Sequence, residues 1–333
     1  MMKRAERWGR GRAAALLPGS ASRWEGPPPQ SPSRILVIRT DSRLGNLMLM
    51  EPLLRSLRER FPDSSMEILA SHVFSDLLRY QGYSVIEVDK KGQIREPSRF
   101  LKLVRELREK RFDVALDAAH PHSFSLSGAV SAILSGSPCR ISTDAGDSPG
   151  WYSLTVPEPP VEWHESRALH ALGSLWDGWP EWSPPRLDPS GAPERDSVGL
   201  HVGAGGGKEY PPEMMEDLVG RICGRTMIEV YWGTERERTA ALKLGEKYPV
   251  AVMPRLSLRR LIDRLAGLRL FVTADNGPMH VASALSVPVI ALFRMDNAHR
   301  FAPLSAGSQI LVHRDGPDPA AVAERVLRTL GCY

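Results

Sequence analysis

The sequence predicts an α/β protein with two domains, each built around a parallel β-sheet, and a ligand-binding cleft between them. The chain has 333 residues, which exceeds the usual size of one hydrophobic core. From residue 34 onward, short apolar runs alternate with amphipathic segments, as expected for the strands and helices of a parallel sheet. A segment rich in proline and tryptophan, 157–193, interrupts the alternation, which resumes at Ser197. In such folds, ligands bind outside the carboxyl ends of the strands.

The first domain is predicted to cover 34–180. It opens with a compact apolar run, 35–38, typical of a buried parallel strand. Further strands are predicted at 66–70, 85–88 and 114–117, and helices at 47–61, 72–81 and 100–110. Pro62 ends the first helix, and a polar turn follows the last strand. Residues 1–33 are rich in Ser, Gly and Pro after a basic start, so we predict a disordered extension there.

The second domain is predicted to cover 197–333, after a helix at 165–176 and a linker at 181–196. Its predicted strands are 198–202, 227–231, 250–253, 270–273 and 289–293. Its predicted helices are 212–222, 235–246, 257–265, 278–285 and 322–330. Ser257 is the expected N-cap of the third of these helices.

Composition excludes several classes of protein. The three cysteines are far apart and form no metal-ligand spacing, which disfavours a disulfide scaffold and a zinc site and fits a reducing compartment. No run of about 18 apolar residues predicts a membrane span, and the apolar stretch 13–17 is too short for a signal-peptide core. We therefore expect a cytoplasmic protein.

The net charge of the chain is +4, which fits either an ordinary solvated surface or attraction to phosphorylated substrates or an anionic membrane face. No nucleic-acid-binding signature occurs in the sequence.

The most specific motif is the strand–turn–helix segment 271–285. A buried strand ends at Asp275, Gly277 permits a tight turn, and Pro278 suits the first helical position. The free amides and the dipole of such a helix N-terminus form a site for an anion such as a diphosphate, and His280 would lie on the first turn, facing that ligand. The alternative is an ordinary strand–turn–helix with Asp275 as its cap.

Two further loops carry polar groups toward the predicted cleft. The glycine-rich segment 200–210 fits neither a Walker A nor a dinucleotide pattern, but its amides and Lys208 could hold a phosphate. The alternative is a mobile surface loop. The segment 38–47 joins the first strand to the first helix and contains Asp41 and Gly45; alone, it could be a simple helix cap.

Weaker signals point in several directions. His120 and His122 lie two residues apart in a turn, where they could touch a substrate or ligate a metal, although a structural role is favoured. The tryptophans at 163–182 could form an acceptor-binding or membrane-facing surface, but packing of the linker is favoured. No Asp-x-Asp motif and no Gly-x-Ser-x-Gly elbow occurs, which disfavours the metal-dependent glycosyltransferase device and an α/β-hydrolase.

Together and in order, these motifs resemble glycosyltransferase family 9, the ADP-heptose:lipopolysaccharide heptosyltransferases. The resemblance covers about residues 34–330. The segments that carry it are Ile35–Pro52, Val198–Pro212, Tyr231–Glu235 and Asp275–His280.

The resemblance implies a GT-B type architecture, in which two Rossmann-like domains face a central cleft. The donor, ADP-heptose, would bind the second domain, and a lipid-linked lipopolysaccharide core saccharide at the membrane surface would bind the first. Catalysis would be inverting, without a metal or a cofactor besides the ADP-sugar donor. Peripheral attachment to the inner face of the cytoplasmic membrane is then an open alternative. The donor-binding residues that the resemblance implies are Gly45, Lys208, Gly233, Glu235, Asp275, Asn276, Gly277 and His280.

One position departs from the family pattern. The opening loop of the family carries an Asp directly after Gly as the presumed catalytic base, and this chain has Asn46 there. An amide is a poor proton acceptor near neutral pH. We therefore expect Asp41 to take the role of base, with Lys208 stabilising the departing diphosphate. The alternatives are a weak or inactive family member that binds nucleotide-sugar or glycan without transfer, and an unrelated two-domain sugar-binding protein.

Overall fold

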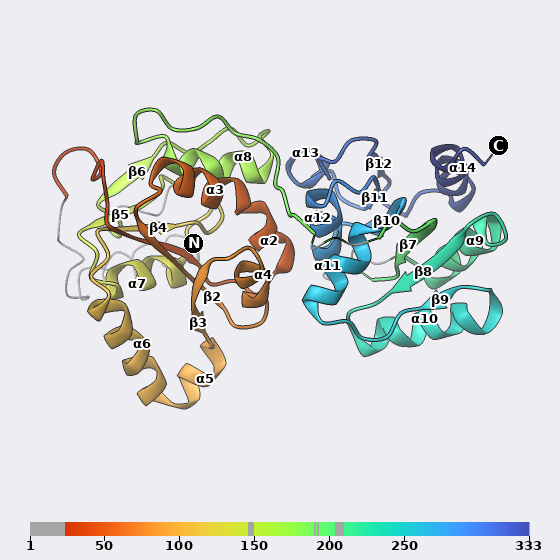
Figure 1. Ribbon diagram of the computed structural model, residues 1–333, viewed down its shortest axis with the longest axis horizontal. Coiled ribbons are helices and arrows are strands. Elements are labelled where there is room, and N and C mark those ends of the chain that lie inside the picture. The colour runs from red at the N-terminus through yellow and green to blue at the C-terminus, as the bar shows by residue number, and fades with distance from the viewer. Residues whose placement is uncertain (1–23, 146–149, 190, 192, 204–209, 333) are drawn as a thin grey trace, which may run out of the picture. The chain divides into compact units, whose positions relative to one another are not determined.

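The computed structural model describes residues 24–145, 150–189, 191, 193–203 and 210–332, except for the side chains of residues 93 and 94. The chain forms two compact units. The first comprises residues 1–43 and 49–183, and the second comprises residues 44–48 and 184–333. Each unit holds one six-stranded sheet in which all strand pairs are parallel, with helices packed on it (Figure 1).

The sheet of the first unit has the strand order β3-β2-β1-β4-β5-β6. Its strands are β1 (Arg34–Arg39), β2 (Ser65–Ser71), β3 (Ser84–Val88), β4 (Val114–Asp117), β5 (Cys139–Thr143) and β6 (Leu154–Val156). The helices along this part of the chain are α2 (Leu44–Leu49), α3 (Glu51–Arg60), α4 (Ser75–Tyr80), α5 (Lys90–Arg95), α6 (Pro97–Glu109), α7 (Leu126–Leu134) and α8 (Glu165–His170). A 3-10 turn, Ala171–Gly173, follows α8.

The sheet of the second unit repeats this topology, with the order β12-β11-β10-β7-β8-β9. Its strands are β7 (Ser197–His201), β8 (Met227–Tyr231), β9 (Ala251–Val252), β10 (Leu270–Ala274), β11 (Val289–Phe293) and β12 (Gln309–Val312). Its helices are α9 (Pro212–Ile222), α10 (Glu235–Lys247), α11 (Leu258–Ala266), α12 (Gly277–Ala284), α13 (Ala298–Phe301) and α14 (Pro319–Leu330). The strand–helix alternation predicted from the sequence is confirmed in both units.

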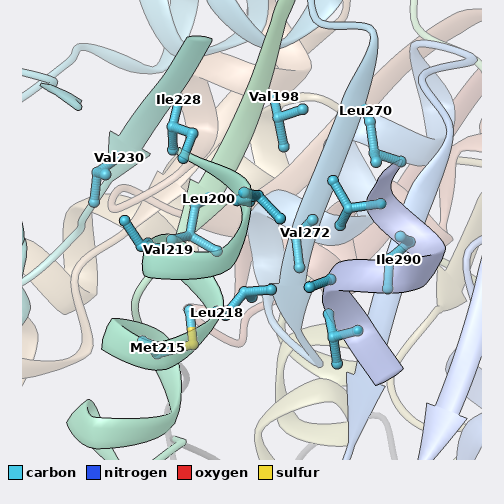
Figure 2. Close-up of a cluster of buried hydrophobic side chains, with 14 of the residues drawn as sticks. Val198, Leu200, Met215, Leu218, Val219, Ile228, Val230, Leu270, Val272 and Ile290 are labelled. Carbon is cyan, nitrogen blue, oxygen red and sulfur yellow. The ribbon is translucent and has the colours of Figure 1, made fainter. Parts of the chain in front are cut away.

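The core of the second unit lies between its central strands and the helices that cover them. Side chains of β7 and β10, including Leu200 and Val272, meet Leu218 and Val219 of α9 (Figure 2), and all four are at most 2% exposed. Burying each aliphatic side chain of this kind stabilises the fold by about 1.5–3 kcal/mol. The strand ends that carry the candidate site are therefore held by a rigid layer beneath them.

The first predicted helix is in fact two helices. The ladder of backbone hydrogen bonds is interrupted between α2 and α3, although Met50 keeps right-handed helical angles, because Pro52 in the first turn of α3 has no amide hydrogen to donate to the preceding turn. The strand β5 was missed because its sequence is polar, yet its residues are all buried. Arg140 of β5 is only 3% exposed and donates from Nη1 to the carbonyl of Ser137 at 3.1 Å, so a charged residue sits inside the sheet.

Two segments outside the regular elements pack on the first unit. Residues 24–33, which we expected to lie outside the fold, contact it: Nε1 of Trp176 donates to the carbonyl of Pro29 at 2.9 Å. Trp176 is 2% exposed, meets Phe61 edge-on and stacks on Trp179. Packing, the favoured interpretation of the tryptophan-rich segment, is confirmed for these two residues. None of the helices in the described ranges is long and apolar enough to cross a membrane.

Candidate active site

Both units place polar loops at the point where the strand order reverses. In the first sheet this point lies between β1 and β4, and in the second it lies between β7 and β10. Loops leaving two such neighbouring strands turn to opposite sides of the sheet, which opens a crevice at their carboxyl ends. Three of the predicted motifs follow these strands: the segment after β1, the glycine-rich loop after β7, and the Asp275–His280 turn after β10.

In the second unit, one side chain joins the two loops at this point. Nδ2 of Asn276 donates to the carbonyl oxygen of Gly203 and to Oγ1 of Thr273, both at 2.8 Å. Oδ1 of Asn276 accepts the amide hydrogen of Met279 at 3.0 Å and so caps α12. The N-cap is therefore Asn276, and not Asp275 as one sequence-based alternative held. The N-terminus of α12, with its partial positive charge, faces the carboxyl end of the sheet.

The loop after β8 is braced by a residue that the sequence analysis missed. Oε2 of Glu237 accepts the amide hydrogens of Gly233 at 2.7 Å and Thr234 at 3.0 Å, and the amide of Glu237 in turn donates to Oγ1 of Thr234 at 3.3 Å. This capping box was visible as Thr-x-x-Glu. Glu237 also lies against the loop after β7, where a Cβ on Gly203 would be 1.9 Å from its carboxylate. Glu235, the predicted donor-binding residue, is instead largely exposed and ion-paired with Arg238 at 3.3 Å.

Three predicted residues come together around the first turn of α12. Segment 44–48 belongs to the second unit, and a Cβ added to Gly45 would lie 2.5 Å from Cδ2 of His280. A Cβ on Gly277 would lie 2.9 Å from Cβ of Leu44. Glycine is therefore required at both positions for steric reasons. Lys208, the expected phosphate contact, lies outside the described residues.

Replacing Asn276 tests how far it holds these loops. Asn276→Ala removes the cap and both side-chain donor bonds, and should lower the free energy of unfolding by about 1–3 kcal/mol. Asn276→Asp keeps the cap acceptor but not the donor, so it should recover only part of that loss. Urea unfolding monitored by circular dichroism measures both. Equal stability of Asn276→Ala and the wild type would contradict the bridging role.

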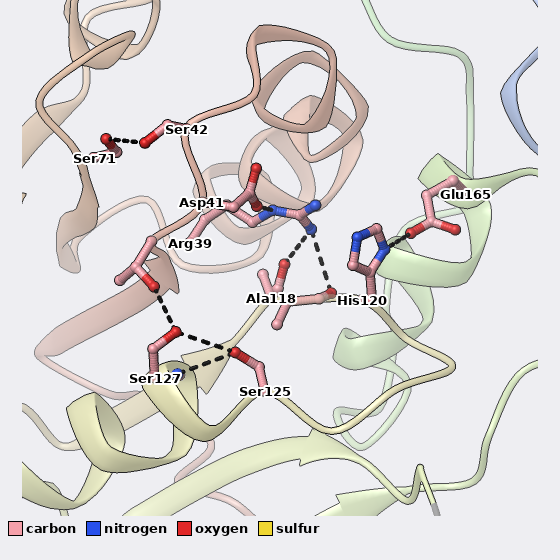
Figure 3. A network of polar contacts seen from close by, with 12 residues as sticks. Arg39, Asp41, Ser42, Ser71, Ala118, His120, Ser125, Ser127 and Glu165 are labelled. Carbon is pink, nitrogen blue, oxygen red and sulfur yellow. Dashed lines mark hydrogen bonds and ion pairs between the residues drawn. The ribbon is translucent and has the colours of Figure 1, made fainter. Parts of the chain in front are cut away.

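In the first unit, a cavity of about 190 Å³ lies at the reversal point. It is lined mostly by polar residues, which follow β1 and β3, end or follow β4, and precede or begin α7. They are Thr40, Asp41, Lys90, Asp117, Ala119, His120, Ser123, Phe124, Ser125 and Ser127. Figure 3 labels four of these residues, Asp41, His120, Ser125 and Ser127.

Asp41 is fixed at the cavity by a buried arginine. Nε of Arg39 lies 2.6 Å from Oδ2 of Asp41, and Nη1 of Arg39 donates to the carbonyls of Ala118 and Ala119 (Figure 3). The Arg39 side chain is fully buried, whereas that of Asp41 is 35% exposed. The carboxylate is therefore held in one place while one side of it stays open to the cavity. Asn46 is 8% exposed and is not part of the cavity wall.

His120 stands on the same wall with a buried partner. Its Nδ1 bonds Oε1 of Glu165 at 2.9 Å, and the Glu165 side chain is 0% exposed, whereas that of His120 is 40% exposed (Figure 3). A carboxylate on Nδ1 fixes the tautomer and leaves Nε2 as the proton acceptor of the neutral ring. His122 pairs with Glu158 at 3.1 Å instead, so the two histidines do not act together.

Asp117 forms the floor of the cavity. It is 3% exposed, accepts the amide hydrogen of Ala119 at 3.1 Å and the hydroxyl hydrogen of Tyr152, and burial raises its pKa to about 6. Helix α7 passes so close that a Cβ on Gly128 would be 2.0 Å from Oδ2 of Asp117. Within the described residues, no group of three or more His, Cys, Asp or Glu side chains is arranged to hold a metal ion.

Comparison with solved structures defines the fold class. The heptosyltransferase WaaC of E. coli, solved with ADP, superimposes with a TM-score of 0.74 at 19% identity, over 89% of this chain and 99% of that one. ADP-heptose lipopolysaccharide heptosyltransferase II of E. coli gives 0.72 at 21% identity, over 89% and 98%. The architecture is therefore of the GT-B type, as predicted.

Sequence comparison then shows which family part of the chain resembles. The profile of glycosyltransferase family 9 (heptosyltransferase) matches residues 192–329. Lipopolysaccharide heptosyltransferase 1 of Pseudomonas aeruginosa is 40% identical over 93 residues, which are 27% of this chain and 26% of that protein. Lipopolysaccharide heptosyltransferase 2 of Salmonella typhimurium is 24% identical over 319 residues, 84% of this chain and 87% of that protein. Residues 192–329, within the second unit, therefore resemble glycosyltransferase family 9. The alignments of this chain with the type 1 relatives span only about a quarter to a third of their length.

Proposed function

We propose that this protein is an inverting, metal-independent glycosyltransferase. It moves a heptose or a related sugar from an ADP-sugar to a lipopolysaccharide core or another cell-envelope glycan. The observation that carries the proposal is the pair of polar sites at the two strand-order reversals, one suited to a diphosphate and the other to a saccharide. The match of residues 192–329 to the family 9 profile supports the same conclusion, as does the ADP bound to a structural relative.

The donor is assigned to the second unit. The N-terminus of α12 attracts an anion, and Asn276 holds the loop after β7 beside it. Gly45 and Gly277 lack side chains where a Cβ would collide with His280 or Leu44. We assign Gly233 and Glu235 to the nucleotide ribose, as the family resemblance implies. Lys208 would neutralise the diphosphate, an assignment that rests on the sequence alone.

The acceptor is assigned to the cavity of the first unit. Its wall offers hydroxyl, carboxylate, ammonium and imidazole groups close together, which suits the many hydroxyl groups of a sugar. An acceptor hydroxyl oxygen attacks the anomeric carbon of the donor sugar from the face opposite the diphosphate. The bond from that carbon to the diphosphate oxygen breaks, its electron pair leaves with ADP, and the hydroxyl proton passes to a base.

Asp41 is the proposed base. It would take the role of the family's aspartate, which is Asn46 in this chain, and Arg39 fixes the Asp41 carboxylate at the cavity wall. His120 is the second proton acceptor on that wall, oriented by Glu165. Because the acceptor would be lipid-linked, we place the protein in the cytoplasm, at the inner face of the membrane. The alternative function is binding of nucleotide-sugar or glycan without transfer, which the amide at Asn46 favours.

The test is a transfer assay with ADP-heptose and a panel of truncated lipopolysaccharides, read by the mass gained by the acceptor. We expect transfer that is unchanged in EDTA. ADP should also stabilise the protein by about 2.7 kcal/mol at 100 times its Kd, seen as a rise in Tm. Activity lost in EDTA and restored by magnesium would overturn the metal-independent mechanism. Stabilisation by ADP without transfer to any acceptor would identify a binding protein.

A further inference from the structure

Basic charge is concentrated in one segment of the first unit. Residues 90–111, which form α5, α6 and the turn after them, contain nine Lys or Arg and three Glu, a net charge of +6. The whole chain carries +4, so all other residues together carry −2. The two helices lie at one end of the first unit (Figure 1). Residues 1–23 also carry six Lys or Arg and one Glu, so this helix pair is one of two basic segments of the chain; we call it the basic hairpin.

The basic hairpin also exposes apolar side chains. Leu107 of α6 is 1% exposed and Leu103 packs partly against the core, so this face holds the helix to the sheet. On the neighbouring face, Leu101 is 66% exposed and Phe100 is 39% exposed. A shallow hollow on this face is lined by Leu101, Val104, Arg105, Arg108, Glu109 and Arg111. An exposed leucine side chain is unfavourable in water, so this face would gain free energy by burying Leu101 against an apolar partner.

Most of the basic side chains around the hollow are free to contact an anionic partner. Arg105 pairs with Glu109 at 2.6 Å, but this pair is itself highly exposed. Arg108 and Arg111 have no acidic partner among the side chains that the structure describes. Helices with exposed Leu or Phe beside Lys and Arg bind the interface of anionic membranes, because the apolar groups enter the lipid while the cations meet the headgroups.

We propose that the basic hairpin docks this protein on an anionic lipid surface through Leu101 and Phe100, with Arg105, Arg108 and Arg111 on the headgroups. Lys90, the first residue of α5, lines the cavity assigned to the acceptor and bonds Oγ of Ser127 at 3.1 Å. The basic hairpin therefore begins at the cavity to which the lipid-linked acceptor is assigned. Vesicle binding does not depend on the proposed function, whereas its purpose, delivery of a lipid-linked acceptor, rests on it.

The experiment is flotation of the full chain with vesicles of phosphatidylcholine alone and of phosphatidylcholine mixed with an equal amount of phosphatidylglycerol. We expect binding to the mixed vesicles only, weakening as salt rises because the Debye length shrinks. Arg105→Glu, Arg108→Glu and Arg111→Glu together should weaken binding by about 100-fold or more, at about 1 kcal/mol for each basic residue. Leu101→Ser should weaken it by about tenfold.

Matched controls lie in the second unit. Met227 is 65% exposed, almost the same as Leu101, so Met227→Ser removes an equally exposed apolar group elsewhere. Arg221, Arg255 and Arg260 are exposed and, replaced together by Glu, change the net charge by the same amount. Neither control should change binding. A second variant with Arg105→Gln, Arg108→Gln and Arg111→Gln removes the charges without introducing acidic ones. Circular dichroism of each variant shows whether lost binding comes from lost folding.

Three outcomes overturn the proposal. They are equal binding to neutral and mixed vesicles, an equal loss in the control variants, and binding of duplex DNA or RNA through the same arginines without binding of vesicles. Transfer to a deacylated, water-soluble acceptor separates this proposal from the proposed function. Hairpin variants should keep that activity. Vesicle binding by a protein that transfers no sugar would refute the function and leave the docking surface standing.

Discussion

Replacement of Asp41 by Asn is expected to lower the turnover of sugar transfer by about 10²–10⁴-fold, the usual contribution of a general base. The reason is the position of its carboxylate, fixed 2.6 Å from Nε of Arg39 and open to the cavity. Asparagine has nearly the same shape and keeps an acceptor oxygen for Arg39, but it does not take up a proton. The Kd for ADP, measured by calorimetry, should change little because the donor is assigned to the other unit.

Two further variants make this test decisive. Asn46→Asp restores the family residue and should be neutral or activating. His120→Gln removes the other proton acceptor on the cavity wall while keeping a polar side chain beside Glu165. If Asp41→Asn keeps full turnover and His120→Gln loses it, the base is His120. If instead only Asn46→Asp raises turnover, from near zero, then the natural protein is a degenerate transferase and Asp41 has a structural role.

The second large effect concerns stability against pH, where two buried groups of the first unit act in opposite directions. Burial raises the pKa of Asp117 to about 6, so the folded state keeps a proton that the unfolded state has lost above pH 4. Its contribution to stability is therefore lost as pH rises from about 4 to about 6. The amount is about 3 kcal/mol, at 1.36 kcal/mol per pKa unit.

His170 has the opposite sign. It is 5% exposed beside Oγ of Ser56, and burial lowers its pKa to about 4. Between about pH 4 and 6.5 the unfolded state binds a proton that the folded state excludes. Stability from this group therefore rises over that window, again by about 3 kcal/mol. In the natural chain the two slopes largely cancel.

Single substitutions should reveal how each group makes the free energy of unfolding depend on pH. Asp117→Asn should make stability climb with pH between about 4 and 6.5, and His170→Gln should make it fall between about 4 and 6. Seven of the eight tryptophans belong to the first unit, so urea unfolding followed by tryptophan fluorescence reports on it. The double variant should be as flat as the wild type. Parallel curves for all four proteins would show that neither group titrates in this range.

Most of the fold could be predicted from the sequence because the strands of both sheets are largely apolar runs. The loops at the points where the strand order reverses contain glycine and proline motifs. The sequence was insufficient where burial contradicts polarity. β5 carries a buried Arg140 and has no apolar run. The short strand β6 and the edge strand β12 were missed as well, the latter although Ile310, Leu311 and Val312 are apolar. The short helices α5 and α13 were missed too, since neither has enough turns to show a helical period. Helix α7 has nine residues, but they are nearly all small or apolar, so no charged face marks a helical period.

The candidate site was only partly predictable for a related reason. Motif positions such as Gly45, Gly277 and His280 come together as expected, because glycine spacing encodes a local turn. Pairs distant in sequence left no signal: Glu165 is 45 residues from His120, and Asn276 is 73 residues from Gly203. Glu237 was the exception, because its capping box is a local pattern.

The contact between Asp117 and Gly128 restricts the order in which this protein can accumulate substitutions. A methyl group at 128 collides with the carboxylate at 117, so any side chain at 128 is harmful in the present background. Once a smaller residue stands at 117, the same change at 128 would fill the vacated space. The two positions should therefore vary as a pair among descendants of this sequence, with the change at 117 arising first.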